Sequence, residues 1–292
     1  IPQGADTEIT PLLQAFAEEK EPVQPPVRLI PSPTSSVPSA HLLSNGRYAV
    51  MITAAGSGYS VWRNLAVTRW REDVTKDAWG SYLYLRDVAS GQVWSAGYQP
   101  TVKPPDHYDV VFAEDRARIT RTDGNMVTTL EILVSPEDDA EIRRLTLTND
   151  GPHAREIEIT SYAEVVLAPM PSDIAHPVFS NLFVRTEYLP KVQGLIAHRR
   201  RRSDGDPNIW AAHVLAGSRT GDGLQYETDR ARFIGRGQTL RDPVSVMDDR
   251  PLTNTVGAVL DPIFSLRTRI RIEAGATEHI ILTTLIAESR QA

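Results

Sequence analysis

The sequence contains no cysteine, which excludes disulfides, thiolate metal sites and a cysteine nucleophile. Its seven histidines are scattered without the spacing of metal ligands, so we expect no metal site. No apolar run approaches the roughly 18 residues that a membrane-spanning helix requires. A net charge of −6 argues against nucleic acid as a partner. The glycine and lysine motifs of nucleotide-binding loops are also missing, so we expect no cofactor.

Helical periodicity is scarce as well. Only residues 5–20 place apolar side chains (Leu12, Leu13 and Phe16) on one face of a short N-terminal helix. Elsewhere, short runs rich in β-branched residues alternate with turn residues at intervals of about ten residues. This pattern predicts an all-β sandwich larger than an immunoglobulin-type domain of about 100 residues.

The domain organisation follows from the prolines. Residues 21–39 hold six prolines, several of them among serines, and predict a Pro-rich linker or extended arm. We therefore expect an N-terminal helix and Pro-rich arm over residues 1–39 and one β-domain over residues 40–292. Because the chain begins with Ile1 rather than methionine, we also expect it to be part of a longer protein.

Two connections between expected strands are interpreted as hairpin turns. Asn149-Asp150-Gly151-Pro152 separates residues 141–148 from 155–163, and Ala274-Gly275 separates residues 265–272 from 279–286. Residues 114–119 also resemble residues 228–233, which indicates a faint internal repeat. Recurrent β patterning is the alternative explanation of that likeness.

Tryptophan, arginine and glycine are concentrated in residues 41–100, which hold four of the five tryptophans. Such residues, presented from turns, suit a surface that binds flat polar rings such as sugars. The alternative is that the tryptophans fill the core and the arginines are solvated.

Candidate acid–base groups are not set apart by their surroundings. Glu164 lies between apolar residues and, if buried, would need a partner such as an arginine. Asp173 and His176 are three residues apart and would suit a catalytic dyad, whereas a turn-capping aspartate beside an exposed histidine is the simpler interpretation.

Several motifs resemble those of glycoside hydrolase family 94, the cellobiose and chitobiose phosphorylases. The likeness is strongest to the phosphorylase-like region of cyclic β-1,2-glucan synthases. It covers about residues 31–288 and rests on short segments, among them Leu43-Ser44-Asn45-Gly46-Arg47-Tyr48, Ala55-Gly56-Ser57-Gly58-Tyr59-Ser60, Thr68-Arg69-Trp70-Arg71, Thr160-Ser161-Tyr162-Ala163-Glu164 and Leu260-Asp261-Pro262-Ile263-Phe264.

The resemblance implies a large β-supersandwich, similar to galactose mutarotase, that precedes a catalytic (α/α)6 barrel. It implies that the general acid and the phosphate site lie in that barrel, so this chain carries no catalytic residue of its own. It also implies a β-glucan oligosaccharide, β-1,2-linked in the synthases, and the barrel itself as partners, with a homodimer as a further expectation. The expected location is the cytoplasmic face, as part of an inner-membrane bacterial protein.

The candidate carbohydrate-contacting residues lie in the glycine-rich loop, in the arginine and tryptophan segments that follow it, and in the loop around residues 176–181. They are Gly56, Ser57, Gly58, Tyr59, Arg63, Arg69, Trp70, Trp79, His176 and Asn181.

Three functions remain open from the sequence. The first is a non-catalytic, carbohydrate-contacting domain that supports the barrel. The second is a structural or dimerisation module without a sugar site. The third, ranked last, is a mutarotase-like enzyme that uses His176 with Glu164, because nothing pairs an acid and a base at a recognisable spacing.

Overall fold

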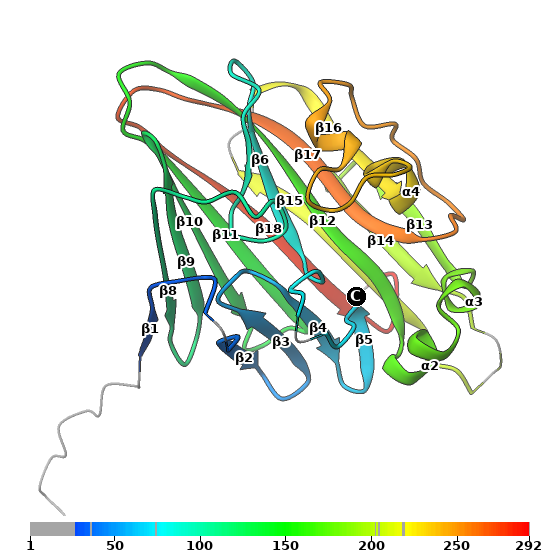
Figure 1. Ribbon diagram of the computed structural model, residues 1–292. Helices are drawn as coiled ribbons and strands as arrows, with labels where there is room; N and C mark the ends of the chain where they lie inside the picture. The colour runs from blue at the N-terminus through cyan, green and yellow to red at the C-terminus, as the bar shows by residue number, and fades with distance from the viewer. Residues whose placement is uncertain are drawn as a thin grey trace, which may run out of the picture.

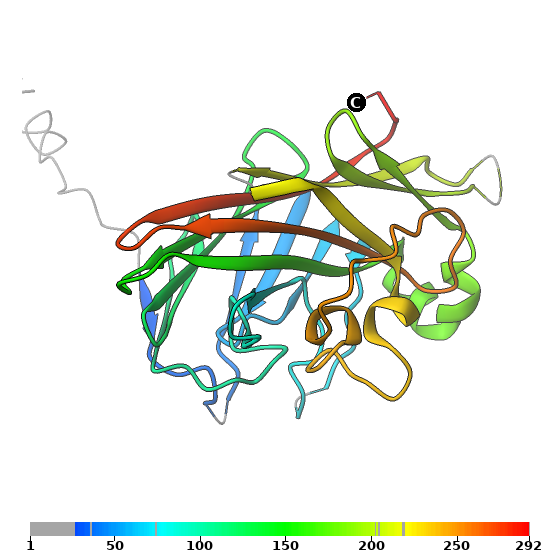
Figure 2. The same ribbon diagram turned by 90° about the horizontal axis from the view of Figure 1, so that it is seen from above.

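The computed structural model describes residues 27–291 apart from residues 36, 74, 202, 204, 218 and 219. These residues form two antiparallel nine-stranded sheets that pack into a sandwich (Figures 1 and 2). The helices gather at the end of the molecule opposite β1, β8 and β9, as both views show. The predicted all-β sandwich is confirmed.

The first sheet begins at an N-terminal edge strand. In spatial order its strands are β1 (Arg28–Ile30), β8 (His107–Phe112), β9 (Ala117–Asp123), β10 (Met126–Val134), β11 (Ala140–Asn149), β18 (Thr277–Ala287), β15 (Ile209–Gly217), β14 (Gly194–Arg199) and β13 (Val184–Leu189).

The second sheet is built around one long strand. In spatial order its main path is β16 (Thr220–Asp229), β17 (Pro262–Ile272), β12 (Arg155–Pro169), β5 (Leu65–Thr68), β4 (Gly58–Trp62), β3 (Tyr48–Thr53) and β2 (Ala40–Ser44). The first half of β12 also pairs with β6 (Tyr82–Asp87), which pairs in turn with β7 (Val93–Ser95).

The helices of the described residues are short. They are α2 (Met170–Ala175), α3 (Pro177–Asn181), α4 (Arg230–Ile234) and α5 (Val244–Met247). Proline is the second residue of α2 and the first of α3, positions where its fixed φ suits the first turn and its missing N–H costs nothing. No helix in the described part of the chain is long and apolar enough to cross a membrane.

Both sheets contribute to one apolar core. Alternate residues of the strands point inward, as in β10, where Met126, Thr128 and Leu130 are buried between half-buried neighbours. Apolar side chains of the first sheet, such as Ile119 and Leu145, belong to the same buried cluster as Ile159 and Leu266 of the second sheet.

The two expected hairpins are wrong. β11 lies in the first sheet and β12 in the second, while β17 lies in the second sheet and β18 in the first. The turn residues therefore carry the chain around a corner from one sheet to the other. A turn composition specifies a change of direction, and it does not specify which strand the chain pairs with next.

Asn149 fastens the two corners together. This buried side chain donates from Nδ2 to the carbonyl oxygens of His153 (2.8 Å), Ile272 (3.2 Å) and Glu273 (3.2 Å). Its backbone N–H donates to the carbonyl of Ala276 at 3.0 Å. The corner before β12 and the corner after β17 thus lie side by side.

The suspected internal repeat is also wrong. Residues 117–119 begin strand β9, whereas residues 230–233 form most of helix α4. Asp229 caps that helix by accepting a hydrogen bond from the N–H of Ala231 at 2.9 Å. Similar sequences thus adopt different structures because their surroundings differ.

The N-terminal arm contributes a strand. Arg28–Ile30, within the segment expected to be a Pro-rich arm, pairs with β8 as the edge strand β1. Proline is tolerated beside such an edge because only one side of the strand is paired. The expected helix over residues 5–20 lies outside the described residues.

Candidate functional site

A buried cluster of charged side chains lies where β5, β12 and the helices α2 and α3 meet. Its centre is Arg69, whose Nη1 donates to Glu164 Oε2 at 2.6 Å and to Asp261 Oδ1 at 3.0 Å. The Nε and Nη2 atoms donate to Asp173 at 3.2 Å, and Nη2 also donates to Asn181 Oδ1 at 2.8 Å. Arg69 is only 6% exposed, so these contacts replace its hydration.

A second arginine completes the cluster. Arg230, the first residue of α4, donates from Nε to Glu164 Oε1 at 2.8 Å, and the hydroxyl of Tyr162 donates to the same oxygen at 2.7 Å. Both carboxylate oxygens of Glu164 are therefore engaged. The expectation that a buried Glu164 would have an arginine partner is confirmed, and it has two.

The charges in the cluster stabilise one another. Burial disfavours the charged form of Arg69, but Glu164 and Asp173 outweigh that effect and raise the pKa of the guanidinium. Burial raises the pKa of Asp261 in spite of the opposing influence of Arg69. A carboxylate whose two oxygens are both engaged by fixed donors, as in Glu164, is poorly placed to pass a proton to a ligand.

His176 does not form an acid–base pair with Glu164 or with Asp173. It lies exposed between α2 and α3, while Glu164 bonds to Arg69, Arg230 and Tyr162. Asp173, its sequence neighbour, is 1% exposed and pairs with Arg69 and with Arg71. The exposed histidine agrees with the simpler interpretation, but Asp173 pairs with arginines and does not cap a turn.

The glycine-rich loop is packed against the rest of the chain. The N–H of Gly58 donates to the carbonyl of Trp79 at 2.9 Å, and Ser57 Oγ donates to the carbonyl of Asp77 at 2.5 Å. A Cβ at Gly58 would lie 1.9 Å from the carbonyl oxygen of Met51. A Cβ at Gly56, where φ is +91°, would approach the Cα of Gly97 to 3.2 Å. These glycines are explained by close backbone approach within the domain.

The tryptophans divide between core and surface. Trp62 and Trp94 are buried, at 3% and 1% exposure. Trp70 is half-buried and its ring lies 5.4 Å from that of Tyr59. Trp79 is half-buried as well, with the guanidinium of Arg71 5.9 Å from its ring centroid. Only Trp70 and Trp79 of these four retain surface for a ligand.

Trp79 lines a cleft of about 480 Å³ that adjoins the buried cluster. Arg230 belongs both to this cleft and to the cluster, and α4 supplies much of the remaining wall. The volume lies within the range of roughly 300–1,000 Å³ that is typical of small-ligand sites. The other lining residues are Ala78, Gln99, Pro100, Val102, Ala231, Ile234, Gly235, Gln238, Thr239, Leu240 and Arg241.

Arg63 lies at the other end of β5 from Arg69. Its φ is +53°, its guanidinium lies 4.3 Å from the ring centroid of Trp62, and Nη1 pairs with Glu288 at 2.6 Å. The structure thus brings together Arg69 and Asn181 by a direct hydrogen bond and Tyr59 and Trp70 by ring contact, and it places Arg63 elsewhere.

Sequence reasoning missed Arg230, the residue that joins the cluster to the cleft. It lies within residues 228–233, which resemble residues 114–119, and nothing in its immediate sequence marks it as a site residue. Asp261 lies in Leu260-Asp261-Pro262-Ile263-Phe264, one of the segments that resemble the family, and this resemblance is the sequence signal for it. Among the described residues, no group of three or more histidine or acidic side chains is placed to hold a metal ion.

The sequence model of the family described as "Glycosyl hydrolase 94, supersandwich domain" matches residues 24–292. The chain belongs to this family. The supersandwich fold that the motifs implied is therefore confirmed.

Curated relatives of this supersandwich domain are much longer proteins. The chain is 40% identical over 272 residues to the cyclic beta-(1,2)-glucan synthase NdvB of Rhizobium meliloti (strain 1021), covering 92% of the chain and 10% of the synthase. It is 27% identical to solabiose phosphorylase of Paenibacillus borealis, covering 66% of the chain and 24% of that enzyme. For the N,N'-diacetylchitobiose phosphorylase of Vibrio proteolyticus the identity is 26%, covering 85% and 30%.

Solved structures that resemble the supersandwich domain include a galactose mutarotase-like protein from Clostridium acetobutylicum. The TM-score is 0.46 at 7% identity, covering 89% of the chain and 98% of that protein. A bacterial glucoamylase complexed with acarbose has a TM-score of 0.46 at 9% identity, covering 91% of the chain and 36% of the glucoamylase.

Proposed function

We propose that the chain is a non-catalytic, carbohydrate-contacting domain of a larger cyclic β-1,2-glucan synthase or a related glycoside phosphorylase. The observation that carries the proposal is the cleft beside Trp79, which an aromatic residue and Arg230 line together. An aromatic face for stacking and fixed donors for hydroxyl groups are the elements that recognise sugars.

The non-catalytic part of the proposal rests on the buried cluster. Glycoside cleavage needs a carboxylic acid that is free to give its proton to the leaving group. Glu164, the buried carboxylate nearest in structure to Arg230, accepts hydrogen bonds from two arginines and a tyrosine. Catalysis would then belong to an (α/α)6 barrel elsewhere in the parent protein, at the cytoplasmic face of the inner membrane.

Fluorescence titration tests the sugar contact. Linear β-1,2-gluco-oligosaccharides are added to the 292-residue chain, with cellobiose as the comparison sugar. We expect a saturable change in tryptophan emission with the β-1,2 series, and its loss in Trp79→Leu. Trp210→Leu is the matched control, because Trp210 lies on β15, where it stacks on His198 of β14, and it does not line the cleft. A response that survives Trp79→Leu would place the sugar elsewhere.

An activity assay tests the absence of catalysis. The purified chain is incubated with linear β-1,2-glucan, with and without phosphate, and neither glucose nor glucose 1-phosphate is expected. Release of either product would overturn the non-catalytic part of the proposal.

A second candidate function is a structural or dimerisation module without a sugar site. Exposed apolar side chains on and beside α2 and α3 favour it: Ile174, Val178 and Leu182 are 55%, 69% and 45% exposed. Such a patch suits contact with the barrel or with a second copy of the chain. A stable dimer by light scattering together with no fluorescence response to sugar would select this function over the first.

A further inference from the structure

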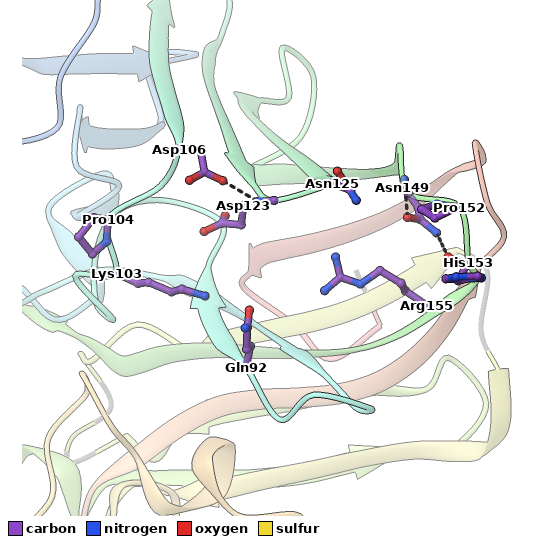
Figure 3. A pocket seen from close by; sticks show the side chains of 12 residues that line it. Gln92, Lys103, Pro104, Asp106, Asp123, Asn125, Asn149, Pro152, His153 and Arg155 are labelled. Carbon is purple, nitrogen blue, oxygen red and sulfur yellow. Dashed lines mark hydrogen bonds between the residues drawn. The ribbon is translucent and has the colours of Figure 1, made fainter.

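A second cleft, of about 540 Å³, lies beside the corner between β11 and β12 (Figure 3). Its walls come from the loop over residues 103–106, the turn between β9 and β10, and the start of β12. It shares no lining residue with the cleft beside Trp79. A ligand of this cleft therefore binds at a site separate from the glucan site proposed above.

Two cationic side chains point toward one another across this cleft. Figure 3 shows Lys103 extending from one side and Arg155 from the other, with the amide of Gln92 between them. Arg155 donates from Nε to Asp87 Oδ2 at 2.7 Å, and its two Nη atoms make no hydrogen bond within the described part of the chain. The ammonium of Lys103 lies 5.5 Å from the ring centroid of Trp94 and has no carboxylate partner among the described residues.

The carboxylates beside these cations already have partners. Asp123 accepts hydrogen bonds from Nε and Nη2 of Arg121, each at 2.7 Å. Asp106 Oδ2 accepts the backbone N–H of Gly124 at 2.6 Å. Lys103 and Arg155 thus retain donors that face the cleft, and Asp106 retains one oxygen without a hydrogen bond among the described residues. Donors of this kind favour a ligand group with several accepting oxygens and negative charge.

Each wall of the cleft is held by a fully buried polar side chain, one on either side. Arg121, at 0% exposure, donates to the carbonyl oxygen of Lys103 at 3.2 Å and to that of Gly97 at 2.7 Å. Asn149, also at 0% exposure, donates to the carbonyl oxygen of His153 on the opposite wall. The backbone at Lys103 and at His153, two residues before Arg155, is thus held before a ligand arrives, which lowers the entropy lost on binding.

We propose that this cleft binds a phosphate group between Lys103 and Arg155. The free Nη atoms of Arg155 form a planar fork that matches two phosphate oxygens, and the compact ammonium of Lys103 matches a third. The phosphate is either free or the anionic end of a sugar phosphate, and the experiment separates these two sources.

Calorimetric titration of the 292-residue chain tests the site at constant ionic strength. The probes are inorganic phosphate, glucose 1-phosphate, glucose and sulfate. We expect saturable binding of the phosphate-bearing probes and none of glucose. Tighter binding of glucose 1-phosphate than of inorganic phosphate identifies a sugar phosphate as the ligand, and equal binding identifies the phosphate group alone.

Substitutions locate the binding. Lys103→Gln and Arg155→Lys are each expected to weaken phosphate binding about tenfold, the effect of one charge-assisted contact. Arg118→Gln and Lys191→Gln are the controls, since they remove a positive charge at exposed positions outside the cleft. Lys103→Gln breaks no ion pair of the described chain, so a folded variant is expected, and circular dichroism checks this.

Three results would overturn the proposal. The first is the absence of saturable phosphate binding. The second is a sulfate affinity equal to the phosphate affinity, combined with phosphate binding that leaves the amide resonances of Gly124 and Gly151 beside the cleft unshifted. The third is an unchanged affinity in both cleft variants. None of these results bears on the glucan titration, which probes the cleft beside Trp79.

Discussion

Glu164 shows how a single buried charge connects distant parts of the chain. Its carboxylate is 3% exposed and accepts hydrogen bonds from Arg69, which follows β5, and from Arg230, which begins α4. Asp173 of α2 and Asn181 of α3 bond to the same Arg69. The geometry of the cleft beside Trp79 thus depends on this one side chain, because Arg230 also lines that cleft.

Glu164→Gln is therefore expected to destabilise the domain. The substitution keeps the shape but leaves Arg69 and Arg230 facing an uncharged group, at a cost of about 3 kcal/mol in the free energy of unfolding. Urea denaturation measures the change. Glu137→Gln is the control, because Glu137 is exposed, and its expected effect is within about 0.5 kcal/mol. Equal stability of the two variants would show that the cluster contributes little.

At the scale of elements, the two sheet-to-sheet corners act as one unit. β11 pairs with β18 in one sheet and β12 pairs with β17 in the other, so both connections cross between the sheets at the same end. Asn149 bonds across them through its side chain. The cleft between Lys103 and Arg155 lies at this end, and Asn149 belongs to its lining.

Asn149→Ala is expected to loosen both corners together. It removes the hydrogen bonds to Ile272 and Glu273 and leaves their carbonyl oxygens without this donor, at a cost of about 2–3 kcal/mol. Amide hydrogen exchange should become faster at the start of β12 and at the end of β17. Asn64→Ala, at an exposed turn, is the control. Faster exchange at the start of β12 alone would contradict the idea of a coupled pair of corners.

At the scale of the whole molecule, His213 connects the two sheets. Its ring, on β15, contacts Ser161 Oγ of β12 at 3.0 Å and Thr284 Oγ1 of β18 at 2.9 Å, and it stacks on Phe264. Burial lowers the pKa of His213 to about 3, and the positive charge of Arg143 contributes to the shift. The imidazole is therefore neutral in the folded domain at all moderate pH values.

This histidine makes stability depend on pH. The unfolded chain takes up a proton near the ordinary pKa of about 6.5, whereas the folded domain resists protonation until about pH 3. The contribution of His213 to the free energy of unfolding is thus fully present above about pH 6.5. It falls by about 1.4 kcal/mol per pH unit as the pH falls toward 3. Urea denaturation between pH 7 and pH 4.5 should show that slope reduced in His213→Gln. The exposed His176→Gln is the control, and an unchanged slope in His213→Gln would assign the pH dependence to other groups.

The sequence by itself determined the local features of this protein. The alternation of apolar and polar residues specified strands, the glycines specified turns, and the motifs specified the supersandwich family. An apolar setting for Glu164 also required an ionic partner, because an unpaired buried charge is too costly. These properties depend on neighbours in the chain or on the chemistry of one residue.

Only the tertiary structure decided which segments meet. The two turn sequences at residues 149–152 and 274–275 became corners rather than hairpins, because strand partners are chosen by the packing of two whole sheets. Arg230 became the second partner of Glu164 through the position of α4, 66 residues away in the chain. Lys103 and Arg155 came to face one cleft in the same way, since long-range packing sets the distance between residues that no local pattern connects.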